Sequence, residues 1–349
     1  QSRHYRLYAV KRRHRFYFLD IAYKSPRKFS INPRSFRDCK PMSDTSTGLT
    51  LFDVAFQAMG TLCTISLYAH SSDNARSLCE VAIADVARLE TKYSRYLLNS
   101  FLSEINGVAE AGGALTVDEE TAALLDYAES CYVESDRLFD ITSGLLRRAW
   151  NFQPEGQTEL PDPEVLDGLL ERVGWDRLDW ESPLLIFDTP GMELDFGGIV
   201  KEYAADRAAT LLKDAGVKHA LINLGGDICV TGPQRGGDPW RVAISDPSNP
   251  ESPLRLVALS QGALASSGSY ARCIEIEGIE YGHLLNPRTG YPFVGMAAAT
   301  VLADQCIVAG SLATIALLKN TEASQFLEQM QLPFLLIDQH RTIFDRLDL

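Results

Sequence analysis

Apolar residues recur at helical spacing in four stretches of the chain. Spacings of three and four positions place such residues on one face of a helix. The pattern therefore predicts helices over residues 73–93, 118–135, 199–215 and 309–319. We expect Asp73 to cap the first of these helices and Gly216 to end the third.

Strand patterns are shorter and mostly come in pairs. Cys63, Ile65 and Leu67 alternate with polar residues, which predicts a strand over residues 56–68. Turn residues separate the other candidate strands, which are expected to pair as 184–187 with 192–196, as 220–224 with 227–230, and as a terminal hairpin over 335–343. Because helices come in clusters and strands in hairpins, the sequence predicts an α+β fold rather than regular βαβ alternation.

Charge is distributed unevenly along the 349 residues. The net charge is −13, yet residues 1–41 hold twelve Lys or Arg against two Asp or Glu, a local charge of +10. The rest holds 33 − 12 = 21 basic and 46 − 2 = 44 acidic residues, a charge of −23. Because residues 42–349 are so acidic, a nucleic-acid partner is not expected. We expect residues 1–41 to be a basic extension outside the fold, upstream of Met42. A transit peptide and a nucleic-acid arm are the alternatives.

Cysteine usage and hydropathy bear on the compartment. The seven cysteines are scattered and form no CxxC pair, which argues against a disulfide framework or a zinc site. No stretch approaches the roughly 18–20 consecutive apolar residues of a membrane-spanning helix. We therefore predict a cytoplasmic protein with no transmembrane segment.

One loop carries the most informative candidate chemistry. His283 stands at the head of a segment, residues 282–292, in which proline and glycine fix a turn. The predicted helix at residues 309–319 follows, with a hydroxyl in its first turn. A histidine on a rigid loop near a helix N-terminus can act as a base beside a bound phosphate. A purely structural histidine is the equal alternative.

Two glycine pairs are further candidates. Gly197 and Gly198 lie between a predicted strand and helix, with Asp195 before them and Lys201 after. Glycines allow a close approach of backbone to a ligand, but a tight turn with a capping Asp195 and a solvated Lys201 explains the pattern as well. The segment 223–227 is more simply a β-turn between two strands.

Taken together and in chain order, these segments resemble the ApbE family, the FAD:protein FMN transferases. The resemblance covers about residues 52–320 and implies one domain over 52–349. The matching segments are Phe56-Gln57-Ala58-Met59-Gly60-Thr61, Tyr93-Ser94-Arg95-Tyr96 with 100–106, Phe139-Asp140-Ile141-Thr142, 194–206, 223–228, 283–292 and 309–314.

The resemblance implies a fold and a reaction. The fold would be two intimately joined lobes of mixed or antiparallel sheet with flanking helices and a ligand cleft between them. The enzyme would bind FAD with Mg²⁺ and move FMN onto a Thr or Ser hydroxyl of an acceptor flavoprotein, releasing AMP. His283 would be the catalytic base, and the Gly198 carbonyl and Thr314 hydroxyl would face the metal. The residues implied at the FAD site are Met59, Tyr96, Leu138, Phe139, Asp140, Asp195, Lys201 and Leu285.

Three positions depart from the family pattern. Gly310 stands where the family usually has the aspartate that binds Mg²⁺, Asn286 replaces another aspartate, and Glu202 stands where glycine is common. Glu202 lies beside Lys201 and can place a carboxylate near the site. Loss of an anionic ligand at position 310 favours one alternative to the transferase, a flavin-binding carrier or sensor without transferase activity. An FAD pyrophosphatase is a third possibility.

Overall fold

The computed structural model describes residues 48–349 apart from 154–156, 247–248, 270–272 and 348–349. The predicted basic extension, residues 1–41, lies outside the described residues.

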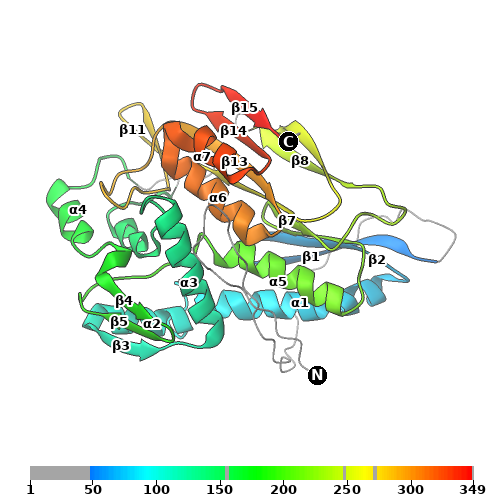
Figure 1. Cartoon of the computed structure of the whole chain (residues 1–349), viewed down its shortest axis with the longest axis horizontal. Coiled ribbons are helices and arrows are strands. Elements are labelled where there is room, and N and C mark those ends of the chain that lie inside the picture. The colour runs from blue at the N-terminus through cyan, green and yellow to red at the C-terminus, as the bar shows by residue number, and fades with distance from the viewer. Residues whose placement is uncertain (1–47, 154–156, 247–248, 270–272, 348–349) are drawn as a thin grey trace.

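An eight-stranded sheet forms the centre of the molecule (Figure 1). Its strands run in the order β1-β2-β6-β7-β10-β13-β14-β15, and every neighbouring pair is antiparallel. The strands are β1 (Thr50–Ala58), β2 (Thr61–Ala69), β6 (Ala220–Leu224), β7 (Asp227–Val230), β10 (Ala263–Gly268), β13 (Met296–Ala303), β14 (Phe334–Asp338) and β15 (Ile343–Arg346). The predicted pair 220–224 and 227–230 and the terminal hairpin are thereby confirmed.

Helices cover one face of this sheet and a long hairpin covers the other. Alternate residues show the division: Cys229 and Ala263 join the helix-covered core, whereas Ile228 and Leu264 pack with Trp240 of the hairpin. The hairpin consists of β8 (Trp240–Asp246) and β9 (Asn249–Leu259), and the covering helices are α1 (Ser72–Tyr93), α5 (Val200–Asp214) and α6 (Cys306–Lys319). In Figure 1, α1 and α5 lie side by side below the sheet.

A second, smaller unit packs beside the end of these helices, at the lower left of Figure 1. Its three-stranded antiparallel sheet has the order β3-β5-β4. This unit contains α2 (Phe101–Ala111), β3 (Gly113–Thr116), α3 (Glu119–Glu134), the 3-10 helices η2 (Ile141–Arg148) and η3 (Trp175–Arg177), α4 (Pro163–Leu170), β4 (Leu178–Glu181) and β5 (Leu184–Phe187). The remaining elements are the hairpin of β11 (Cys273–Ile276) and β12 (Ile279–Gly282), η4 (Asn320–Glu322) and α7 (Ala323–Met330).

The α+β prediction is confirmed, and four local predictions are corrected. Residues 56–68 form two strands, because Met59 and Gly60 make a two-residue turn between β1 and β2. Residues 192–196 form no strand, since β5 pairs with β3 and β4 instead. The first helix is capped by Ser71 rather than Asp73, and the last predicted one begins three residues early, at Cys306.

Gly216, with φ of +85°, follows the last turn of α5 as predicted. Within the described residues, no helix is both long enough and apolar enough to cross a membrane.

Candidate functional site

Two tight turns lie side by side at one end of the central sheet. Met59 and Gly60 both have positive φ, +53° and +70°, which suits a two-residue hairpin turn. The turn between β6 and β7 is formed by Gly225 and Gly226, with φ of +65° and +101°. The two turns touch, because a Cβ on Gly225 would lie 2.5 Å from Thr61 Cγ2. The first and fifth of the resembling segments therefore meet here.

A second contact region joins segments that are about 100 residues apart in the sequence. The Arg95 guanidinium pairs with the Asp195 carboxylate and donates a 2.8 Å hydrogen bond to the Tyr96 hydroxyl. Asp195 Oδ1 also accepts a 2.9 Å bond from the Gly197 N–H. Tyr96 is 78% exposed, so its ring is accessible at the surface while its hydroxyl is held. The predicted site residues Tyr96 and Asp195 are thus linked through Arg95.

The segment 138–144 packs directly against the glycine turn before α5. A Cβ on Gly198 would lie 3.3 Å from Phe139 Cζ, so the Phe139 ring covers this glycine. The Asp195 N–H donates to the Ile141 carbonyl at 2.8 Å. Buried Asp140 accepts bonds from the Thr142 N–H at 2.8 Å, the Thr142 hydroxyl at 2.7 Å and the Trp175 N–H at 3.1 Å. The side chain of Asp140 therefore holds its own segment together.

Lys201, at the start of α5, faces two buried carboxylates. Its ammonium group pairs with Asp227 of β7, and Asp227 raises the pKa of Lys201 although burial opposes that shift. Glu202 is 7% exposed. Burial and then the adjacent Asp227 carboxylate raise the pKa of Glu202 to about 8. This part of the fold brings one cation and two acids together inside the protein.

Helix α6 contributes two small residues beside this cluster. Gly310 faces Glu202, and Thr314 follows one helical turn later on the same side of α6. The Thr314 hydroxyl lies 2.7 Å from the Ser267 hydroxyl of β10. The backbone of Ser266, the preceding residue, hydrogen-bonds Asp227. Thr314 therefore borders the region of Asp227 through Ser266 and Ser267 of β10.

The His283 loop is closed by hydrogen bonds across the turn that its proline and glycine residues predict. The Asn286 N–H donates to the Tyr291 carbonyl, and the Gly290 N–H to the Asn286 carbonyl, both at 2.8 Å. The Trp150 indole donates to the Gly290 carbonyl, also at 2.8 Å. Leu285 packs into the small apolar clusters around Trp150 and Leu166.

His283 is half-buried, and its neighbour Gly282 packs against Ser269, just beyond the end of β10. A Cβ on Gly282 would lie 2.7 Å from the Ser269 Cβ, two residues beyond Ser267.

The predicted role of the α6 N-terminus in holding a phosphate is not supported by the structure. The first N–H groups of α6, from Cys306 and Ile307, donate to the two Asp206 carboxylate oxygens at 2.8 and 2.9 Å. Asp206 belongs to α5, so one helix caps the other. The segment 309–314 lies deeper, in the buried middle of α6. Of the two helix starts considered, the start of α5 is the one without a side-chain cap.

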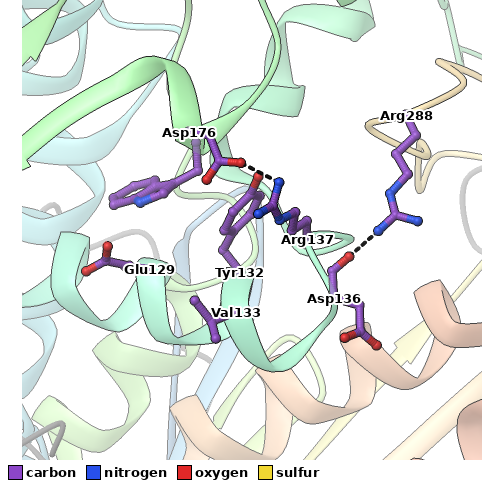
Figure 2. A pocket seen from close by; sticks show the side chains of 8 residues that line it. Glu129, Tyr132, Val133, Asp136, Arg137, Asp176 and Arg288 are labelled. Atoms are coloured by element: carbon purple, nitrogen blue, oxygen red, sulfur yellow. Dashed lines mark hydrogen bonds and ion pairs between the residues drawn. The ribbon is translucent and has the colours of Figure 1, made fainter. Parts of the chain in front are cut away.

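A cavity of about 410 Å³ opens away from these residues (Figure 2). It lies between the end of α3, η3 and the tip of the His283 loop. Arg137 and Asp176 form a 2.6 Å ion pair across it, and Arg288 donates to the Asp136 carbonyl. Its lining includes none of the residues predicted to bind flavin or metal.

The described residues fit a Mg²⁺ ion of the kind that the resemblance implies. They contain no group of three or more His, Cys, Asp and Glu arranged to hold a metal. Mg²⁺, however, commonly uses one or two carboxylates and completes its shell with water and substrate phosphate. The buried Glu202 Oε2 accepts no hydrogen bond, and the Asp227 carboxylate lies next to it. This donor set of hard oxygens suits Mg²⁺ rather than a softer metal.

The sequence interpretation missed two features of this region. It treated Lys201 as solvated in the simpler alternative and gave no partner to Asp227. The signal for Asp227 was present, because an aspartate opens a strand, Asp227–Val230, whose other residues are all apolar. A charged residue in a fully buried strand needs a partner of opposite charge.

Comparisons with known proteins identify the family of this chain. A sequence model described as the ApbE family matches residues 59–336. The chain is 29% identical over 279 residues to the FAD:protein FMN transferase of Vibrio cholerae serotype O1, covering 76% of this chain and 83% of that protein.

Two solved structures are also similar. The ApbE protein from Thermotoga maritima has 27% identity and a TM-score of 0.74, covering 84% of this chain and 96% of that one. The flavin transferase ApbE from Vibrio cholerae has 24% identity and a TM-score of 0.75, covering 85% and 96% respectively, and shares the fold. Since the family match spans well over half of its residues, the chain belongs to the ApbE family.

Proposed function

We propose that this enzyme transfers FMN from FAD to a Thr or Ser hydroxyl of an acceptor flavoprotein and releases AMP. Family membership makes the chain a transferase, and the Vibrio cholerae relative is an FAD:protein FMN transferase. The observation that carries the proposal is the meeting of the resembling segments around Lys201, Asp227 and the Gly197-Gly198 turn. A cytoplasmic setting is part of the proposal and rests on the scattered cysteines, five of which are buried free thiols.

The proposed roles follow from the chemistry of a phosphoryl transfer. A hydroxyl is a poor nucleophile, so His283 takes its proton as the oxygen attacks the phosphorus of the FMN half. The bond to the bridging oxygen of the pyrophosphate breaks, and AMP leaves with that oxygen. When bound, Mg²⁺ offsets the charge that develops on the leaving phosphate.

The flavin site is proposed at the sheet end, where Met59, Tyr96 and Phe139 offer apolar and aromatic surfaces beside the glycine turns. Asp195 and Lys201 lie next to the same turn, and Leu138, Asp140 and Leu285 support the segments that form it. The Gly198 carbonyl and the Thr314 hydroxyl are proposed to face the metal.

A transfer assay tests the proposal. The purified chain is incubated with FAD, Mg²⁺ and an acceptor flavoprotein domain, and the acceptor is examined by mass spectrometry for a covalent FMN adduct. We expect His283→Ala to lose at least 100-fold in rate, in line with general-base catalysis. His340→Ala, an exposed histidine on the β14–β15 turn, is the matched control and should keep full activity.

The alternatives are separate outcomes of the same assay. AMP released without any acceptor would indicate an FAD pyrophosphatase. FAD binding with neither adduct nor AMP would indicate a carrier or sensor. A His283→Ala variant that transfers as fast as the wild type would remove the proposed base.

A further inference from the structure

Gly310 has an unusual position in the middle of a buried helix. Glycine in a helix interior costs roughly 0.5–1 kcal/mol relative to alanine, so a packing reason is expected for it. The structure supplies one, because a Cβ on Gly310 would overlap the Glu202 Cγ and lie 3.1 Å from the Glu202 Cδ and Oε1. The side chain of Glu202, from α5, therefore occupies the place that a side chain at position 310 of α6 would take.

The Glu202 carboxylate at this place is not satisfied within the protein. It is 7% exposed, and its Oε2 accepts no hydrogen bond. The Asp227 carboxylate lies next to it, and burial beside this second acid favours the neutral form of Glu202 when no cation is bound. Ionised Glu202 would be costly to bury with Oε2 unpartnered, so its ionised form needs a group that binds Oε2.

The local charge indicates what that group is. Within the described part of the chain, Lys201 is the cation that acts on both carboxylates, and its ammonium group is paired with Asp227. With Glu202 ionised, one positive and two negative charges give 1 − 2 = −1, a charge that a bound cation would balance. The Thr314 hydroxyl stands one turn from Gly310 on the same side of α6. Carboxylate and hydroxyl oxygens are ligands that a hard divalent cation prefers.

We propose that Glu202 is a direct ligand of the divalent cation and that Gly310 is required to admit its side chain. The anionic ligand is thus delivered from α5 instead of from α6, where the resemblance implies an aspartate, so that Glu202 and Gly310 form one exchange. The inference rests on the proposed function, in which that cation accompanies the FAD pyrophosphate. On this reading, Gly310 no longer favours a carrier that has lost its metal.

Cation binding is measured directly, apart from catalysis. The purified full chain is titrated with Mn²⁺ and the free ion is followed by EPR, with FAD present and with FAD omitted, against protein-free controls. Glu202→Gln keeps the size of the side chain and removes its charge, and we expect at least tenfold weaker Mn²⁺ binding. Glu120→Gln, which also removes a largely buried carboxylate, should bind Mn²⁺ like the wild type.

The exchange itself is tested by a pair of substitutions. Gly310→Asp alone should bind Mn²⁺ poorly or fail to fold, because its side chain and that of Glu202 compete for the same space. The double variant Glu202→Gly with Gly310→Asp should fold and recover Mn²⁺ affinity to within a few-fold of wild type. Thermal unfolding gives a second readout, since Mn²⁺ should raise the Tm of the wild type and the double variant but not that of Glu202→Gln.

Failure of the inference and failure of the proposed function give different results. If Glu202→Gln binds Mn²⁺ as tightly as the wild type, or the wild type binds none with FAD present, Glu202 is not a ligand. The transferase proposal then survives as long as FAD binds and the adduct forms. If FAD does not bind while Mn²⁺ binding still depends on Glu202, the cation site stands and the proposed reaction is wrong.

Discussion

Asp140 gives the sharpest test of how this site is built. The resemblance puts Asp140 at the flavin, yet its two carboxylate oxygens already accept three hydrogen bonds, two from Thr142 and one from the Trp175 N–H. Asp140→Ala leaves two buried backbone N–H groups without an acceptor. Each such loss costs about 1–3 kcal/mol, so we expect the free energy of unfolding to fall by roughly 2–6 kcal/mol.

The assay compares stability with ligand affinity. Urea unfolding followed by circular dichroism gives the change in stability, and flavin fluorescence gives the Kd for FAD. Asp140→Asn keeps one acceptor oxygen and should lose less stability than Asp140→Ala. Asp176→Ala is the control for a nearby carboxylate, because Asp176 is half-exposed in its pair with Arg137 and should change stability by less than about 1 kcal/mol.

One pattern of results would refute this reasoning. If Asp140→Ala unfolds at the wild-type urea concentration but binds FAD much more weakly, Asp140 contacts the flavin and its internal bonds are unimportant. If stability and FAD affinity fall together and Asp140→Asn is intermediate in both, its role is to hold the 138–144 segment in place.

Three further predictions concern pH and packing. Burial raises the pKa of Glu120, but Arg88 and Lys92 outweigh burial and lower this pKa to about 2. The stability that ionised Glu120 gives to the fold is therefore present above about pH 4.5 and is lost as pH falls toward 2. The deficit of Glu120→Gln in urea unfolding, about 3 kcal/mol at pH 7, should therefore vanish near pH 2. Burial raises the pKa of Asp206 to about 6, so stability is lost as pH rises from about 4 through 6. In urea unfolding, the free energy of unfolding of Asp206→Asn should rise by about 2–3 kcal/mol relative to that of the wild type between pH 4 and pH 7. A difference between the two proteins that does not change with pH would contradict the raised pKa of Asp206. A Cβ at Gly290, where φ is +73°, would lie 2.7 Å from buried Leu166 atoms, whereas Gly278, with φ of +80°, has open space. In thermal melts, Gly290→Ala should lose about 2–4 kcal/mol of stability and Gly278→Ala about 1 kcal/mol. Equal losses would exclude a contribution from packing against Leu166.

Local pattern was sufficient for some elements and insufficient for others. The helix 199–215 and the strands 220–224 and 227–230 were predicted almost to the residue, because strong periodicity and glycine signals coincide there. The β1–β2 turn was missed because methionine rarely adopts the positive φ that Met59 has. Residues 192–196 have strand-like composition, but a strand needs a partner. Both edges of β5 are already paired, one with β3 and the other with β4.

The site segments were predictable as segments, while the contacts between them were not. Lys201 and Asp227 are 26 residues apart, and Arg95 and Asp195 are 100 apart. Pairings at such distances depend on the tertiary fold, so no local pattern reports them. The cap that Asp206 provides to α6 is hidden in the same way, since it comes from another helix instead of from the residues before Cys306.

These pairings have a consequence for how an anion can enter the site. The two cations next to the Gly197-Gly198 turn and the β6–β7 turn, Arg95 and Lys201, are each already bound to a carboxylate. Counted with ionised Asp195 and Asp227, and with Glu202 neutral as its pKa of about 8 implies, they give 2 − 2 = 0. A doubly charged pyrophosphate diester added to that cluster would bring it to −2 in a partly buried setting, where charge repulsion is poorly screened. At the proposed cation site, a divalent cation bound to ionised Glu202 would bring the total to −1. We therefore expect the affinity of the proposed enzyme for FAD to depend on the cation, and equal FAD affinity with and without Mg²⁺ would show that the pyrophosphate lies elsewhere.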